Sequence, residues 1–86
     1  MNVTSDRLKD VVTNFLSETK ESLKAAKNQR DLLFAIEENL RFEGEHEKAD
    51  FTLVEIGHQD SAISFLESRI SRFDMALGRL DDAGDE

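Results

Sequence analysis

The stretch that decides the fold is ADFTLVEIGHQDSAISFLESRISRFDMALGRL, residues 49–80. Apolar residues recur along it at intervals of seven, at Ala49, Ile56, Ile63, Ile70 and Leu77, with Leu66, Phe73 and Leu80 three residues after the last three of these. Thr52 and Gln59 occupy the two equivalent earlier positions. This spacing is the a/d heptad pattern of a helix that packs along a single seam. The stretch therefore predicts a long helix in a coiled-coil type of contact.

The first half of the chain predicts a second long helix. It contains no Pro, and the first Gly is Gly44. A stripe with alternating steps of four and three runs through Leu8, Val12, Phe15, Thr19, Ser22, Ala26, Gln29, Leu33, Ile36 and Leu40. Gly44 can adopt the left-handed conformation that ends a helix. We therefore expect a helix over about 4–43, a turn over about 44–48 and a helix over about 49–80, in one domain spanning 1–80.

The last six residues, 81–86, read DDAGDE and follow the final apolar position of the second stripe. Carboxylates at this end of a helix oppose the negative end of its dipole. Chain ends without apolar anchors are also commonly poorly ordered. We therefore expect 81–86 to form a disordered acidic tail.

Two such stripes predict an all-α fold, a hairpin of two long antiparallel helices. If the hairpin folds about residue 45, residue i lies opposite residue 90 − i, and small residues in the middle of the first stripe then meet large ones in the second. Several apolar residues lie off this seam, among them Phe34, Phe42, Phe51 and Val54. Exposed apolar patches mark interfaces, so we expect a second hairpin to cover them in a four-helix homodimer.

A different fold is suggested by residues 51–56, FTLVEI, which are rich in residues that favour strands. Gly57 follows this run, and Asp60 or Ser61 could cap a new helix. The alternative fold is therefore a long helix, a short extended segment over 51–56 and a shorter helix over 61–80. A single short strand of this kind would need a partner from another chain.

Composition narrows the function classes. The chain has 86 residues, no Cys and a formal net charge of -8. The negative charge argues against direct binding of nucleic acid or of an anionic membrane. No apolar run approaches the length of a membrane span, and the chain shows no signal-peptide pattern, so we expect a soluble cytoplasmic protein. No nucleophile, phosphate-loop or dinucleotide motif occurs, so we expect neither an enzyme nor a cofactor.

All of the excess negative charge belongs to the second half. Residues 1–42 have a net charge of zero, whereas residues 43–86 carry the whole -8. Such a surface can simply keep a protein soluble, or it can bind a basic partner. We expect a small acidic regulator or inhibitor that binds a partner protein and covers a basic nucleic-acid-binding surface. The candidate partner-binding residues are Phe34, Phe42, Phe51, Val54, Phe65, Glu43, Glu45, Glu47 and Asp50.

Both histidines follow a glutamate by three residues, as Glu43 with His46 and as Glu55 with His58. On a helix this spacing places a carboxylate and an imidazole on one face, as in di-iron helical bundles. The pairs are twelve residues apart, about 18 Å along a helix, so one chain cannot join them in one site. A metal-binding helical oligomer is therefore an alternative function.

The turn carries a further resemblance. Phe42-Glu43-Gly44 stands where the small secreted helical hairpins of the WXG100 family have Trp-x-Gly, and the hairpin layout is similar to theirs. The resemblance implies a secreted hairpin that pairs with another small helical protein. The sequence departs from the family in having Phe for Trp, and in place of the family's C-terminal Tyr-x-x-x-Asp/Glu signal it has only Phe73 followed by Leu77.

Overall fold

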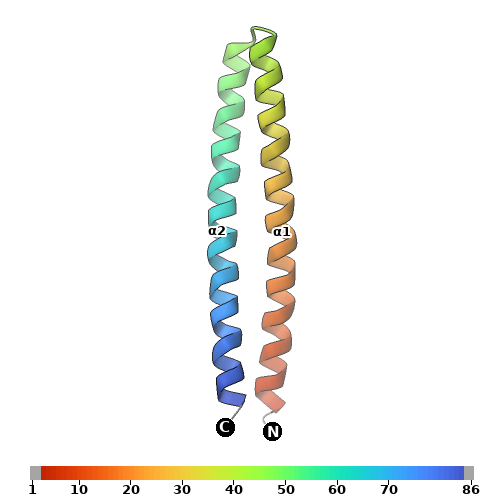
Figure 1. Ribbon diagram of the computed structural model, residues 1–86, viewed down its shortest axis with the longest axis vertical. Helices are drawn as coiled ribbons and strands as arrows, with labels where there is room; N and C mark the ends of the chain where they lie inside the picture. Colours follow the sequence, from red (N-terminus) through yellow and green to blue (C-terminus); the bar gives the residue numbers. More distant parts are fainter. Residues whose placement is uncertain (1–2, 85–86) are drawn as a thin grey trace.

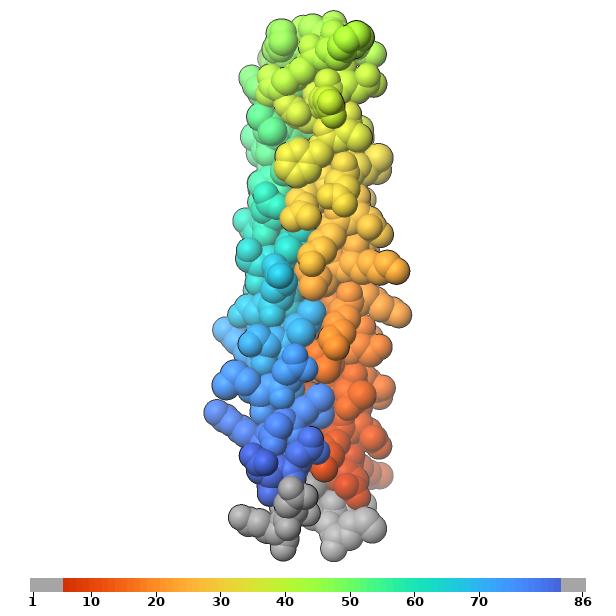
Figure 2. Space-filling view, in the orientation of Figure 1, coloured from red at the N-terminus to blue at the C-terminus, as the bar shows by residue number. Residues whose placement is uncertain are grey.

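The computed structural model describes the backbone of residues 3–84 and the side chains of residues 6–82. Two helices, α1 (Val3–Phe42) and α2 (His46–Gly84), lie side by side and antiparallel (Figure 1). They form a rod of 65 × 14 × 13 Å, and its space-filling surface is narrow along the whole length (Figure 2). The predicted all-α helical hairpin is therefore confirmed.

The turn is built on Gly44, the residue at which the sequence predicts the helix to end. Its φ of 80° lies in the left-handed region. The amide of Gly44 donates to the carbonyl of Arg41 at 3.1 Å, and the amide of Glu45 donates to the carbonyl of Leu40 at 2.8 Å. These two bonds form a Schellman motif, which satisfies carbonyl groups at the C-terminus of α1. The carbonyl of Glu45 then accepts from the amide of Ala49 at 3.0 Å, so α2 follows at once.

The predicted register, with residue i opposite 90 − i, is confirmed by contacts between the helices. Among the described side chains, three ion pairs cross from α1 to α2: Lys9 with Asp81 at 2.9 Å, Arg30 with Asp60 at 3.5 Å, and Arg41 with Asp50 at 3.0 Å. Two of them obey the relation and the third misses it by one residue. Near the open end, the rings of Phe15 and Phe73 stack with their centroids 6.1 Å apart.

The seam of α2 is the predicted one. Ala49, Ile56 and Ile63 are buried. The remaining seam residues are half-buried, namely Thr52, Gln59, Leu66, Ile70, Phe73, Leu77 and Leu80. A two-helix rod covers each helix from one side only, which leaves most of the seam partly open to water. The core is consequently a thin line of side chains.

The seam of α1 differs from the prediction by one residue in every heptad. Leu16 is buried and Leu23 is half-buried, although the sequence pattern placed both off the seam. Leu8, Phe15 and Ile36, predicted on the seam, are 47%, 47% and 41% exposed. The seam of α1 instead runs through Lys9, Val12, Leu16, Thr19, Leu23, Ala26, Arg30, Leu33, Glu37 and Leu40.

The orientation of α1 brings cations at the margin of its seam to carboxylates of α2. The observed seam places Lys9 and Arg30 at its margin, where the ammonium and guanidinium groups contact carboxylates of α2. Between them lies Thr19, which is buried, and its hydroxyl donates to the carbonyl of Phe15 at 2.6 Å. A buried polar group costs little when its hydrogen bond is made. The polar residues of this seam therefore all have partners for their polar groups. The apolar stripe that was predicted to be the seam lies beside it.

The alternative fold with an extended segment over 51–56 is wrong. These residues lie within α2, and the described residues contain no strand. Thr52 and Ile56 contribute to the helical seam. Gly57 follows on the exposed side without interrupting the helix, and nothing lies within 4 Å of where its Cβ would be. Packing of every third and fourth residue against α1 thus outweighs the strand preference of this run.

The bounds of α2 are wider than predicted. It begins at His46 and not at about 49, because the Gly44 turn needs only three residues. The negative charge of Glu47 in the first turn also stabilises the N-terminus of α2, which is the positive end of the helix dipole. It continues through Gly84, so residues 81–84, predicted as disordered tail, are helical. The ion pair of Asp81 with Lys9 holds this last turn against α1. Residues 85 and 86 lie outside the described residues.

The seam can be tested with one buried and one exposed residue. We expect Leu16→Ala to lower the free energy of unfolding by about 2–3 kcal/mol, because it empties part of the core. Met75 is 58% exposed, so Met75→Ala should change it by less than about 0.5 kcal/mol. Urea unfolding followed by circular dichroism measures both. Equal losses in the two variants would contradict the seam described for α1.

The turn can be tested with two glycines whose substitution should have opposite effects. No heavy atom lies within 4 Å of the position that an added Cβ would take at Gly44 or at Gly57, so the substitutions differ only in backbone preference. Gly44→Ala should destabilise the hairpin by about 1 kcal/mol, because Ala resists the left-handed conformation. Gly57→Ala should stabilise it by about 0.5–1 kcal/mol, because Ala favours a helix interior. Thermal melting measures the shift in melting temperature of each variant. Shifts of the same sign would contradict the left-handed conformation at Gly44 or the helical one at Gly57.

Candidate functional site

The turn end of the rod exposes large apolar side chains. Phe42, the last residue of α1, is 91% exposed, and Phe51 on α2 is 67% exposed. Val54, one turn further along α2, is 55% exposed. Phe42 thus stands almost free of its own chain. Exposure of this degree for two aromatic rings so near each other in the sequence is unusual for a surface with no binding role.

The exposed residues at the turn end fall into two shallow grooves. Phe51 and Val54 line one of about 220 Å³ on α2, together with Glu47 and Asp50. Phe42 lines another, of about 510 Å³, on α1. Its other lining residues are Ala35, Ile36, Glu38 and Asn39. Each groove combines apolar side chains with carboxylates.

The predicted carboxylates of the turn end have different surroundings. Asp50 accepts from the guanidinium of Arg41 at 3.0 Å, and Glu45 lies 3.8 Å from the ammonium of Lys48. Glu47 and Glu43 form no ion pair within the part of the chain that the structure describes. The uncompensated charge of the turn end therefore belongs mainly to these two glutamates, one of which borders the groove of Phe51.

Arg41 ties the two helices together beside the turn, and it was not among the predicted site residues. Its guanidinium hydrogen-bonds the carboxylate of Glu37 one helical turn earlier and that of Asp50 across the seam. The hydrogen bond to Glu37, followed by that to Asp50, raises the pKa of Arg41 above its usual value. The cation is thus permanently charged. The i,i+4 spacing and the register relation together identify this contact from sequence.

Two further predicted partner-binding residues lie away from the turn. Phe34 is 46% exposed and precedes Phe42 by eight residues, about 12 Å along α1. Phe65 is 59% exposed and follows Phe51 by fourteen residues, about 21 Å along α2. The guanidinium of Arg69 lies over the ring of Phe65 at 5.8 Å and over that of Phe73 at 5.5 Å. Phe65 therefore belongs to a separate cluster in the middle of the rod.

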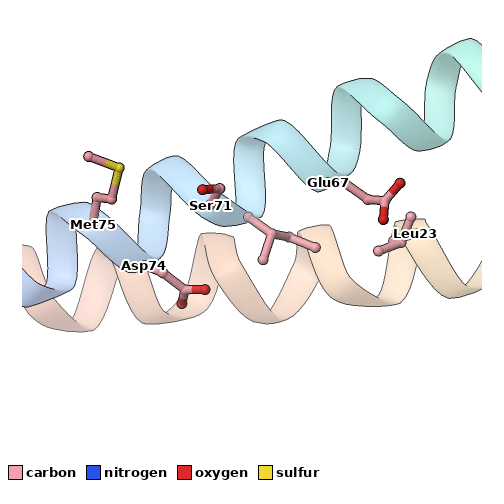
Figure 3. A pocket seen from close by; sticks show the side chains of 6 residues that line it. Leu23, Glu67, Ser71, Asp74 and Met75 are labelled. Carbon is pink, nitrogen blue, oxygen red and sulfur yellow. The ribbon is translucent and has the colours of Figure 1, made fainter.

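A pair of grooves meets at Leu23 on the middle of the rod. One holds the acidic side, with Glu67 and Asp74 extending from α2 toward α1, while Met75 points away from α1 (Figure 3). The other holds the basic side, which is lined by Lys20, Lys24 and Lys27. Together with the Arg30–Asp60 pair, this arrangement places basic side chains of α1 near Asp60 and Glu67 of α2. Part of the acidic charge is therefore balanced within the hairpin.

The candidate metal ligands do not converge. Glu43 lies in the turn, so it does not share a helix face with His46, whereas Oε2 of Glu55 and Nδ1 of His58 lie 3.9 Å apart on exposed α2 surface. No group of three or more His, Cys, Asp or Glu side chains suited to hold a metal ion occurs among the described residues.

Neither described helix contains an 18-residue window apolar enough to cross a membrane. Comparison with known proteins gives no relative: no protein-family model, no curated protein and no solved structure matches the chain significantly.

Proposed function

We propose that this chain is a non-enzymatic protein-interaction module that binds a partner protein through the turn end of the hairpin. The observation that supports this most directly is the groove on α2, where Phe51 and Val54 are exposed beside Glu47 and Asp50. The partner it fits has an apolar projection surrounded by basic side chains. Aromatic anchors with a charged rim are the common composition of a binding hot spot.

Charge supplies the second part of the recognition. Glu43 and Glu47 add negative charge next to the exposed Phe42 and Phe51. A negative patch at the tip of a narrow rod attracts a basic partner over roughly one Debye length, about 10 Å at 0.1 M salt. Such attraction raises the association rate more than it raises the affinity.

The basic surface that fits the turn end is of the kind that also binds nucleic acid, so the hairpin competes for that surface. Nucleic-acid sites are built from clustered Lys and Arg that neutralise phosphates. The carboxylates of the turn end present negative charge to such a cluster. In this form the module acts as a regulator or inhibitor of nucleic-acid binding.

The proposal can be tested by affinity capture from the native host with the intact chain as bait. Glu43→Gln/Glu47→Gln removes charge at the turn, and Phe51→Ala/Val54→Ala removes the apolar part of the groove. Matched controls are Glu67→Gln/Asp74→Asn and Met75→Ala, which make similar changes on the middle of the rod. We expect one basic protein to be retained at low salt by the wild type and the controls, and to be lost with either turn variant.

Salt gives a second readout of the same interaction. Retention should fall steeply as ionic strength rises, because the Debye length shrinks to about 3 Å at 1 M salt. Circular dichroism would establish that all variants stay helical. Retention that is independent of salt, or that survives both turn variants, would refute the proposal.

A further inference from the structure

One side of the rod carries an apolar stripe that the hairpin does not use. We call it the lateral face. Its large apolar members are Leu8, Val11, Phe15, Leu32 and Ile36 on α1 and Phe51 and Phe65 on α2, and each is between 41% and 67% exposed. Each of these residues lies one place before a seam position of its helix. In an antiparallel pair such positions of both helices line the same side. The stacking of Phe15 on Phe73, with Arg69 over Phe65 and Phe73, marks this side.

The lateral face leaves the single hairpin with more surface than a compact chain. The accessible surface is 6426 Å², whereas a compact monomer of this mass exposes about 5,200 Å². The three ion pairs that cross between the helices among the described residues lie elsewhere, at Lys9, Arg30 and Arg41. Large apolar side chains at heptad positions beside the seam are what a helix in a four-helix bundle uses to contact its second neighbour.

The composition of the lateral face is ordered along the rod. Toward the chain termini the face carries Arg72, Arg79 and Glu18, and toward the turn it carries Glu55 and Lys48, while Arg69 lies close to its middle. The middle is also lined by the small residues Ser22, Ala25 and Ala62. When one copy is reversed, Arg79 approaches Glu55 of the other copy, and the small residues at the centre meet each other.

We propose that a second copy of this chain docks on the lateral face, antiparallel to the first, around a two-fold axis that passes near Ser22. This relation places α1 against α1 and α2 against α2 of the other copy. Leu8 of one copy then lies level with Ile36 of the other. On α2 the axis passes at the level of residue 68, so Arg79 comes within two residues of the level of Glu55, and Arg69 within two residues of that of Phe65. One register thus matches apolar with apolar, cation with anion, and cation with aromatic ring.

The opposite orientation, with both rods pointing the same way, matches the face poorly. A two-fold axis along the rod would place α1 of one copy against α2 of the other at the same height. Val11 would then lie level with Arg79, and Leu32 with His58. Burying apolar side chains against charged ones forfeits both the hydrophobic gain and the ion pairs.

The area of the lateral face suits a stable dimer. A face 65 Å long and 14 Å wide covers about 900 Å², close to the 800 Å² or so that each partner contributes to a standard interface. The small residues near the axis allow the two α1 helices to approach closely. The dimer does not rest on the binding function proposed for the turn, because the groove of Phe51 and Val54 contains none of the residues that the dimer register pairs.

The first test compares two exposed residues of α2 by sedimentation equilibrium. Phe65 and Met75 are 59% and 58% exposed, but only Phe65 belongs to the lateral face. The wild type and Met75→Ala should sediment at low micromolar concentration with twice the chain mass of 9.8 kDa. Phe65→Ala should raise the dimer dissociation constant by about tenfold, because it removes the aromatic ring that Arg69 of the other copy meets. A monomeric wild type, or equal dissociation constants for the two variants, would overturn the proposal.

The second test locates the axis by a cross-link, since the chain has no Cys. Ser22 and Ser68 are both exposed and lie level with each other on the rod, but Ser68 faces outward from α2. Under mild oxidation Ser22→Cys should form a covalent dimer readily, because residues on the axis come within disulfide distance. Ser68→Cys should stay unlinked. Failure of Ser22→Cys to cross-link, or equal linking of both, would overturn the antiparallel register.

A charge swap provides a check that leaves the apolar face intact. Arg79→Glu should weaken the dimer by repulsion from Glu55, and adding Glu55→Arg should restore it. The turn variants Glu43→Gln/Glu47→Gln should leave the dimer mass unchanged. If they abolish capture of a partner while the dimer persists, the two proposals stand separately. If the charge swap fails to restore the dimer, the register of α2 against α2 is wrong.

Discussion

The turn at Gly44 is the constraint on which the rest of the structure depends. A left-handed residue at this one position lets α1 end and α2 begin within three residues, and so fixes which residues meet along the whole rod. The ion pairs of Lys9 with Asp81 and of Arg30 with Asp60 lie far from the turn and still obey the register that it sets. With a longer linker, only the side chains of the core would determine the register, and this thin core has few buried residues that could do so.

The fold class and the register were predictable because they depend on patterns that tolerate error. The absence of Pro and the position of Gly44 determine two helices and their joint. The heptad of α2 is unambiguous, because Ile56, Ile63 and Ile70 have no competing apolar stripe beside them. The strand preference of residues 51–56 failed as a guide because it describes single residues, whereas the packing of α2 on α1 acts on the whole helix.

The seam of α1 was not predictable from hydrophobicity, because two stripes compete for it. Both share Val12, Leu33 and Leu40 and differ only in the residues that alternate with these. The more apolar choice uses Leu8 and Phe15, but the observed one lets Lys9 and Arg30 reach the carboxylates of α2. The observed stripe also buries Leu16 and half-buries Leu23, where the predicted stripe has Phe15 and Ser22. The predicted stripe, with Leu8 and Phe15, therefore remains at the surface and forms part of the lateral face.

The candidate site was predictable in part for a similar reason. Exposure of Phe42 and Phe51 follows from their places off the seam, and the acidity of the turn is visible in the sequence. The position of Phe65 in a separate cluster with Arg69 is not, since it depends on how the helices turn about their axes. Arg41 was not among the predicted residues because its role depends on the contact with Asp50, which only the register of the two helices creates.

Because the chain doubles back, Val3 and Gly84 lie at the same end of the rod and the turn lies at the other (Figure 1). The molecule thus has the geometry of a rigid spacer, with its attachment points 65 Å or so from its tip. In the proposed antiparallel pair, two such spacers overlap and their tips point in opposite directions. A pair of this kind would be bivalent: it would hold two copies of the proposed partner apart at a fixed distance, and avidity for an ordered array of that partner would follow from geometry alone.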